Sequence, residues 1–150
     1  MLFRSRPQNS YDAQFSIPFA VASGLVRGKF GLAELEPECL SDAEILGVAE
    51  KVEYRVDPDS PFPKYYSGEV VVTLKDGREL RHREQVNRGA SDRPLGAAEI
   101  AEKFMENATM ALPYRDAERV RDAVLGLDGE LPAAQFSALL GGRQGRNASQ

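Results

Sequence analysis

The sequence has 150 residues, a length that suits one domain with a core of its own. Its 19 basic and 23 acidic residues give a net charge of −4 and form no basic stripe, which argues against a nucleic-acid partner. Cys39 and His82 are the only cysteine and the only histidine, which excludes an internal disulfide and a histidine-cluster metal site. Residues 1–14 lack the apolar stretch of a signal peptide, and we expect a cytoplasmic protein.

The stretch from Ala13 to Arg27 carries no charge before Arg27 and predicts a buried helix, apolar nearly all round. Ser16 suits the N-cap, Pro18 fits the first turn, and Gly28 fits the position after the last turn. The run is too short to span a bilayer, which takes about 20 apolar residues. Two stripes have helical spacing: Ile17, Ala20, Val21, Gly24 and Leu25, and beside them Phe19, Ala22 and Val26.

A short helical turn is predicted at 31–35, and a second helix begins near Ser41. Ser41 and Glu44 have the spacing of a capping box, and Leu40 and Ile45 have that of the accompanying hydrophobic staple. Cys39, just before this helix, is interpreted as a small buried residue.

Period-two alternation then predicts a small antiparallel sheet with strands at about 52–58, 69–75 and 78–86. Asp76-Gly77 predicts a two-residue type I′ hairpin turn between the last two strands. The last strand is very polar, which indicates an edge. His82 falls on its more apolar side, and we interpret it as a partly buried strand residue, with a catalytic role as the alternative.

The loop at 87–94 contains Arg88 and Arg93, which either contact a phosphate or carboxylate or lie in a solvated connection. Helices are predicted after Gly96, after Pro113 and from Pro132 onward, and residues 141–150 are expected to be disordered. Runs of helix, strand and helix predict an α+β fold, with helices packed on one face of the sheet.

The segment from Gln14 to Ala22, followed by Gly28, resembles the start of the C-terminal domain segment of the MmgE/PrpD family. That family includes 2-methylcitrate dehydratase, cis-aconitate decarboxylase and iminodisuccinate epimerase. Residues 52–58, the turn at 75–78, Pro94-Leu95 and residues 99–104 follow in the family's order. The resemblance covers about 12–140 and implies one domain there, with an incidental or disordered arm at 1–11 and a tail at 141–150.

The resemblance implies the smaller, lid-like α+β domain of an enzyme whose large helical domain is missing here, and therefore a fragment. Such enzymes abstract a proton next to a carboxylate and then lose water, lose CO2 or epimerise the substrate, without a cofactor. The implied partners are a small polycarboxylate and the missing helical domain, with no nucleic acid or membrane; a homodimer stays open. The alternative is a stand-alone α+β binding or interaction module without catalysis.

The residues themselves support no catalytic or metal-binding assignment, because no nucleophile–base pair or known catalytic motif can be assembled. A helix that begins at Ser16 points N–H groups and a positive dipole end at what precedes it, which favours an anion. Gln14 and the Ser16 hydroxyl add donors, and Phe19 can form a wall, so we predict a substrate carboxylate at these three residues. The alternative is that Ser16 only caps the helix.

One departure from the family concerns the same segment. Near it, the cis-aconitate decarboxylases resemble Ser-x-x-Tyr, with the tyrosine reaching the active site, whereas this chain has Ser16 and Phe19. The missing phenolic hydroxyl weakens the case for cis-aconitate decarboxylation in particular.

Overall fold

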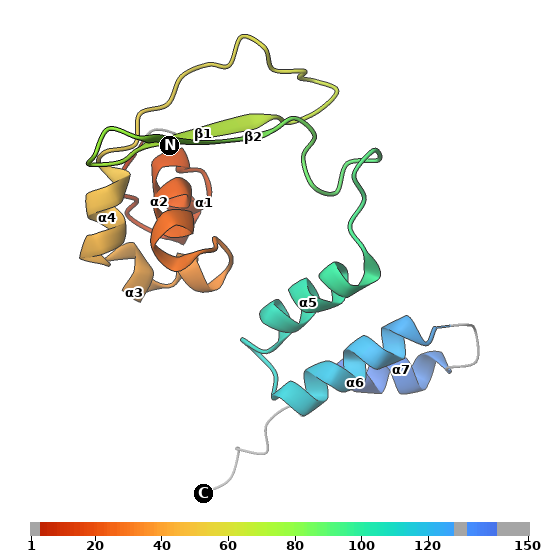
Figure 1. Ribbon diagram of the computed structural model, residues 1–150. Coiled ribbons are helices and arrows are strands. Elements are labelled where there is room, and N and C mark those ends of the chain that lie inside the picture. The colour runs from red at the N-terminus through yellow and green to blue at the C-terminus, as the bar shows by residue number, and fades with distance from the viewer. Residues whose placement is uncertain (1–3, 128–131, 141–150) are drawn as a thin grey trace, which may run out of the picture. The chain divides into compact units, whose positions relative to one another are not determined.

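A computed structural model describes residues 4–127 and 132–140 of the chain (Figure 1). The chain divides into two compact units, one ending at Ser60 and one beginning at Pro61. In the described residues, the first unit is helical and the second contains a two-stranded antiparallel sheet followed by helices. The predicted α+β class is thereby confirmed. Every described helix is too short or too polar to traverse a bilayer.

The described part of the first unit is built from short helices joined by tight connections. Its core lies where α2 packs against α4, and the half-buried Cys39 lies at the edge of this core. The elements are α1 (Ser10–Gln14), α2 (Ile17–Arg27), the 3-10 helix η1 (Ala33–Leu35), α3 (Pro37–Leu40) and α4 (Ala43–Ala49). The buried core consists of Ala13, Phe19, Ala22, Ile45, Leu46 and Ala49.

The ends of α2 are those that the sequence predicts. Ser16 caps the first turn, Pro18 lies within that turn, and Gly28 follows the last turn with a φ of 77°. A positive φ of this size favours glycine, because in any other residue the Cβ would lie too close to the carbonyl oxygen that follows it. The short helical turn predicted at 31–35 is likewise confirmed as η1.

The prediction that α2 is buried all round is wrong. Phe19 and Ala22 are fully buried, but Ile17 and Leu25 of the other stripe are 41% and 52% exposed. The core of the first unit covers one side of α2. Ile17, Val21 and Leu25, spaced four residues apart, lie on the opposite side. Part of this apolar stripe is therefore left at the surface.

Helix α4 is capped by Asp42, so the predicted capping box at Ser41 is wrong. The Asp42 carboxylate accepts hydrogen bonds from the backbone N–H groups of Glu44 and Ile45 at 2.9 and 3.3 Å. Ser41 instead ends α3 and donates its hydroxyl to the carbonyl of Pro37 at 2.9 Å. Helix α3 was not predicted from the sequence, and Pro37 opens it from a first-turn position that suits proline.

The second unit places its sheet before its described helices. Glu99 of α5 accepts a hydrogen bond from the N-cap N–H of Gly96, and α6 packs against both α5 and α7. The helices predicted after Gly96, Pro113 and Pro132 are confirmed. The elements are β1 (Gly68–Thr73), β2 (Glu79–Glu84), α5 (Ala97–Ala108), α6 (Tyr114–Leu125) and α7 (Ala133–Leu140). The tail predicted at 141–150 lies outside the described residues.

The hairpin has the predicted faces but a different turn. Val70 lies opposite His82 in the pairing of the two strands. Because side chains alternate between the two faces of a strand, this register confirms the predicted faces of the second strand. At the turn, Leu74 N–H donates to the Arg78 carbonyl at 2.8 Å, and the φ of Gly77 is 84°. Asp76 has no positive φ, whereas a type I′ turn requires one at both central residues. The loop is therefore three residues long, 75–77, with glycine in the left-handed position.

The third strand, predicted at 52–58, does not form. This segment has no helical or strand structure, and Val56 is 93% exposed. Alternating polarity makes a strand only where a neighbouring strand accepts its hydrogen bonds, and Pro58, Pro61 and Pro63 follow without N–H groups to offer. Within the described residues, the sheet consists of β1 and β2.

Candidate functional site

The predicted substrate-contact residues lie at the junction of α1 and α2. Gln14 is the last residue of α1, Ser16 is the N-cap of α2, and Phe19 lies in the first turn of α2. Gln14 is at the surface, whereas Ser16 is 1% exposed and Phe19 is fully buried. The three residues share one end of a helix, but solvent reaches only the first of them freely.

The Ser16 hydroxyl has two partners. It accepts a hydrogen bond from the Phe19 N–H at 3.1 Å and donates its own proton to the Arg4 carbonyl at 2.5 Å. A hydroxyl carries one proton, so its capacity to donate is used. The sequence predicts the cap, because its two partners are close in the chain. It does not predict the hydrogen bond to Arg4, which lies 12 positions away. A ligand at this end has to compete with the Arg4 carbonyl.

The ring of Phe19 belongs to the core of the first unit. It packs edge-on against Phe30, with ring centroids 6.2 Å apart. This contact packs the Phe19 side chain against the segment that follows α2. Of the three predicted residues, Gln14 is the one whose side chain is exposed to incoming molecules.

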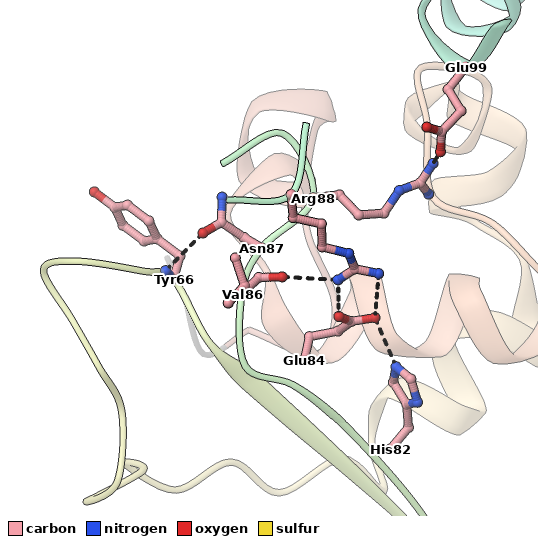
Figure 2. A network of polar contacts seen from close by, with 8 residues as sticks. Tyr66, His82, Glu84, Val86, Asn87, Arg88 and Glu99 are labelled. Carbon is pink, nitrogen blue, oxygen red and sulfur yellow. Dashed lines mark hydrogen bonds and ion pairs between the residues drawn. The ribbon is translucent and has the colours of Figure 1, made fainter. Parts of the chain in front are cut away.

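A second polar cluster lies where β2 leads into the loop before α5 (Figure 2). The Glu84 carboxylate meets His82 Nε2 at 3.0 Å and pairs with the Arg93 guanidinium. Arg93 also donates to the Val86 carbonyl at 2.9 Å. Hydrogen bonds from Arg93, and then from His82, hold the pKa of Glu84 below its ordinary value. Glu84 is therefore an ionised acceptor at neutral pH.

The interpretation of His82 as a partly buried residue is wrong, because its side chain is 75% exposed. Its cross-strand partner Val70 is 38% exposed, so this face of the hairpin lies at the surface. A carboxylate partner orients an imidazole, as it does in catalytic triads. A catalytic role for His82, the alternative interpretation, stays untested.

The arginines of the 87–94 loop both meet carboxylates of the chain itself. Arg88 pairs with Glu99 (Figure 2). Glu99 also accepts the Gly96 N–H at 2.9 Å. The Gly96 N–H, followed by Arg88, holds the pKa of Glu99 below its ordinary value. Together with the Arg93–Glu84 pair, this means that a ligand anion in the loop would have to displace an internal one.

Two hydrogen bonds that the sequence did not predict connect this loop to the segment before β1. The Tyr65 hydroxyl bonds to Asp92, and the Tyr66 N–H donates to Asn87 Oδ1 at 3.1 Å. The paired residues are 27 and 21 positions apart, so no local sequence pattern predicts these two hydrogen bonds.

A hollow of about 360 Å3 lies between α5 and α6. In the described part of the chain, no three histidine, cysteine, aspartate or glutamate side chains gather closely enough to hold a metal ion. The hollow mixes acidic, basic and apolar groups without a focused set of donors, so we assign it no ligand. Its lining consists of Ala101, Glu102, Met105, Glu106, Thr109, Tyr114 and Arg121.

Comparison with known proteins identifies related sequences over most of the chain. The family model of the MmgE/PrpD C-terminal domain matches residues 2–129. The chain is 25% identical to cis-aconitate decarboxylase of Homo sapiens over 140 residues, which is 93% of this chain and 29% of that protein. For the Mus musculus enzyme the values are 25% over 111 residues, 73% and 22%.

A third relative is the cis-aconitate decarboxylase-like protein oryM of Aspergillus oryzae. It is 24% identical over 138 residues, which is 91% of this chain and 28% of that protein. The chain thus spans less than a third of the length of the curated relatives that it matches.

Proposed function

The chain belongs to the MmgE/PrpD family as a C-terminal domain, and we propose that it serves an enzyme acting on small di- or tricarboxylates. The observation that carries the proposal is the family match over residues 2–129, together with relatives named cis-aconitate decarboxylase. The proposed chemistry is proton abstraction next to a carboxylate, followed by dehydration, decarboxylation or epimerisation.

In this proposal the chain is catalytically incomplete alone. It matches only 22% to 29% of the length of its relatives, so most of their length has no counterpart here. His82 is its single histidine, and the carboxylates that it offers near the hairpin are paired with arginines. The remaining acid and base groups come from a helical domain, which closes over the substrate together with this one.

We place the substrate contact at the junction of α1 and α2, at Gln14, Ser16 and Phe19. The positive end of the 11-residue helix α2 favours a carboxylate there. Gln14 supplies an exposed amide, Ser16 a hydroxyl, and the buried Phe19 ring a rigid support. Because Phe19 lacks the hydroxyl of a tyrosine, dehydration or epimerisation fits this site better than cis-aconitate decarboxylation.

Solvent deuterium tests the proposal directly. The purified chain and the longest product of its reading frame are each incubated in D2O with 2-methylcitrate and with cis-aconitate. Proton NMR then follows deuterium entering at the carbon next to a carboxylate. We expect incorporation with the longer product and none with the chain alone. The carbanion left by proton abstraction takes up a deuteron from D2O when that carbon is reprotonated, in the substrate by reversal or in the product of decarboxylation or epimerisation.

Each alternative has its own signature in this assay. Deuterium incorporation by the chain alone would contradict catalytic incompleteness. Binding of carboxylates without incorporation by either product would instead favour a stand-alone binding module.

A further inference from the structure

The residues before α1 lie across the start of α2, and we name residues 4–8 the N-terminal strap. The Arg4 carbonyl accepts the Ser16 proton at 2.5 Å, and Pro7 is buried. Arg6 Nε donates to Glu50 Oε1 at 2.6 Å, and Glu50 directly follows α4. The strap is thus attached to the beginning of one core helix and to the end of the other.

We propose that this strap regulates the carboxylate contact at Ser16, an inference that rests on the substrate site proposed above. With the strap closed, the Arg4 carbonyl holds the single proton of the Ser16 hydroxyl. With the strap open, that proton is free for a ligand carboxylate. One proton does not serve both acceptors fully, so closing of the strap and binding of the ligand exclude each other at this atom.

The chemistry of the two acceptors favours exchange. A hydrogen bond from a hydroxyl to an ionised carboxylate is roughly twice as strong as one to a neutral carbonyl. A carboxylate that reaches Ser16 therefore shifts the strap toward its open state, because it interacts with that state alone. A neutral ligand of the same shape has no such advantage.

The contacts that hold the strap are weak enough to yield. The Arg6 and Glu50 side chains are 58% and 48% exposed, and pairs of this kind change an equilibrium by only about two- to fivefold. The Arg4 guanidinium lies 3.9 Å from Asp12 and is 62% exposed. The Gln8 N–H reaches Asp12 Oδ2 at a long 3.4 Å. Of the strap's side chains, Pro7 is the one that is buried.

Arg6→Ala and Glu50→Gln loosen the strap from its two sides without touching the substrate-contact residues. Arg55→Ala is the matched control, because Arg55 is 88% exposed and lies 3.8 Å from Glu53 in the same unit. Trypsin reports on opening, because cleavage after Arg4 requires release of the carbonyl that Ser16 holds. Mass spectrometry identifies this cut, and the proline at position 7 protects the bond after Arg6.

Binding is measured on the full chain with tricarballylate, an unreactive tricarboxylate, and with its neutral triamide as a blank. The NMR signals followed are the Phe19 backbone amide and the Gln14 side-chain amide. We expect both strap variants to accelerate cleavage after Arg4 and to lower the apparent Kd of tricarballylate by the same factor, about two- to fivefold. Arg55→Ala should change neither, and saturating tricarballylate should itself accelerate the cut.

The failures are distinguishable. Faster cleavage with an unchanged or higher Kd would overturn the strap as a regulator and leave the carboxylate site standing. Unchanged cleavage in both variants would overturn it as well, because the Arg6–Glu50 pair would then not hold the strap. No response to tricarballylate, even after deletion of residues 1–7, would remove the Ser16 site together with its regulation. The family-level chemistry would still be decided by the deuterium assay.

Discussion

Ser16 at the N-cap of α2 and Ser23 within α2 are expected to respond in opposite ways to substitution by alanine. Ser16 and Ser23 are 1% and 0% exposed. The Ser16 hydroxyl has two hydrogen-bond partners, whereas that of Ser23 meets none among the described residues. Replacing each by alanine removes one oxygen from the same helix, so the two variants differ chiefly in what that oxygen touches.

The magnitudes follow from those contacts. Ser16→Ala loses an N-cap, which costs about 0.5–2 kcal/mol, and strands the Arg4 carbonyl, which adds about 0.5–1.5 kcal/mol. We expect a total loss of about 1–3.5 kcal/mol. Ser23→Ala removes a buried polar group without a partner, which costs about 1–3 kcal/mol to keep, and alanine is the better helix former. We therefore expect Ser23→Ala to be neutral or to stabilise the first unit by up to about 2 kcal/mol.

Urea denaturation followed by circular dichroism gives the free energy of unfolding of each variant. Because the chain divides into two compact units, amide hydrogen exchange within α2 is used to assign the change to the first unit. Equal losses in both variants would refute the reasoning, since they would mean that the hydrogen-bond environments of the two hydroxyls do not differ as described.

Acid should weaken the second unit, because guanidinium hydrogen bonds hold the pKa of Glu69 and of Glu84 below the ordinary glutamate value. A carboxyl with a lowered folded pKa gives its full stabilisation above that ordinary value, near pH 4.3, and loses it as the pH falls through the folded pKa. Denaturation between pH 7 and 3 checks the sign, and a gain in stability on acidification would contradict it. Gly77 has a φ of 84°, whereas Gly47 lies within α4 with open space for a Cβ. Gly77→Ala should therefore cost about 1–2 kcal/mol and Gly47→Ala should gain about 0.5–1 kcal/mol in thermal melts, and equal signs would contradict the turn geometry. The exposed stripe of α2 predicts self-association, which Leu25→Lys should reduce in light scattering; a strictly monomeric parent chain at high concentration would rule this out.

Features fixed by a few neighbouring residues were predictable from the sequence. Ser16 predicts a helix start, because its side chain can accept a hydrogen bond from the N–H three residues further on. Gly28 predicts the helix end, because glycine readily adopts a positive φ. The start of α4 was misplaced because Ser41 and Asp42 are adjacent and both can cap. Pro37 begins another short helix, α3, whose C-cap is Ser41, so Asp42 is left as the N-cap of α4.

Features that depend on distant partners were not predictable. Residues 52–58 alternate as a strand does, but a strand exists only where another pairs with it. His82 falls on the face predicted, yet its exposure depends on what covers that face. The Tyr65–Asp92 contact and the Arg4–Ser16 contact join positions whose proximity no local period encodes. The candidate site was therefore predictable as a helix start, but its occupation by the strap was not.

Serine suits a regulated contact at position 16 better than a charged residue would. A lysine or arginine would attract a carboxylate more strongly, but neither has an acceptor with which to cap α2. The Ser16 hydroxyl accepts from the Phe19 N–H whatever takes its proton, so its structural role does not depend on the Arg4 carbonyl. Exchange of that carbonyl for a ligand carboxylate leaves the helix start intact. The strap can therefore open without unfolding the helix that it covers.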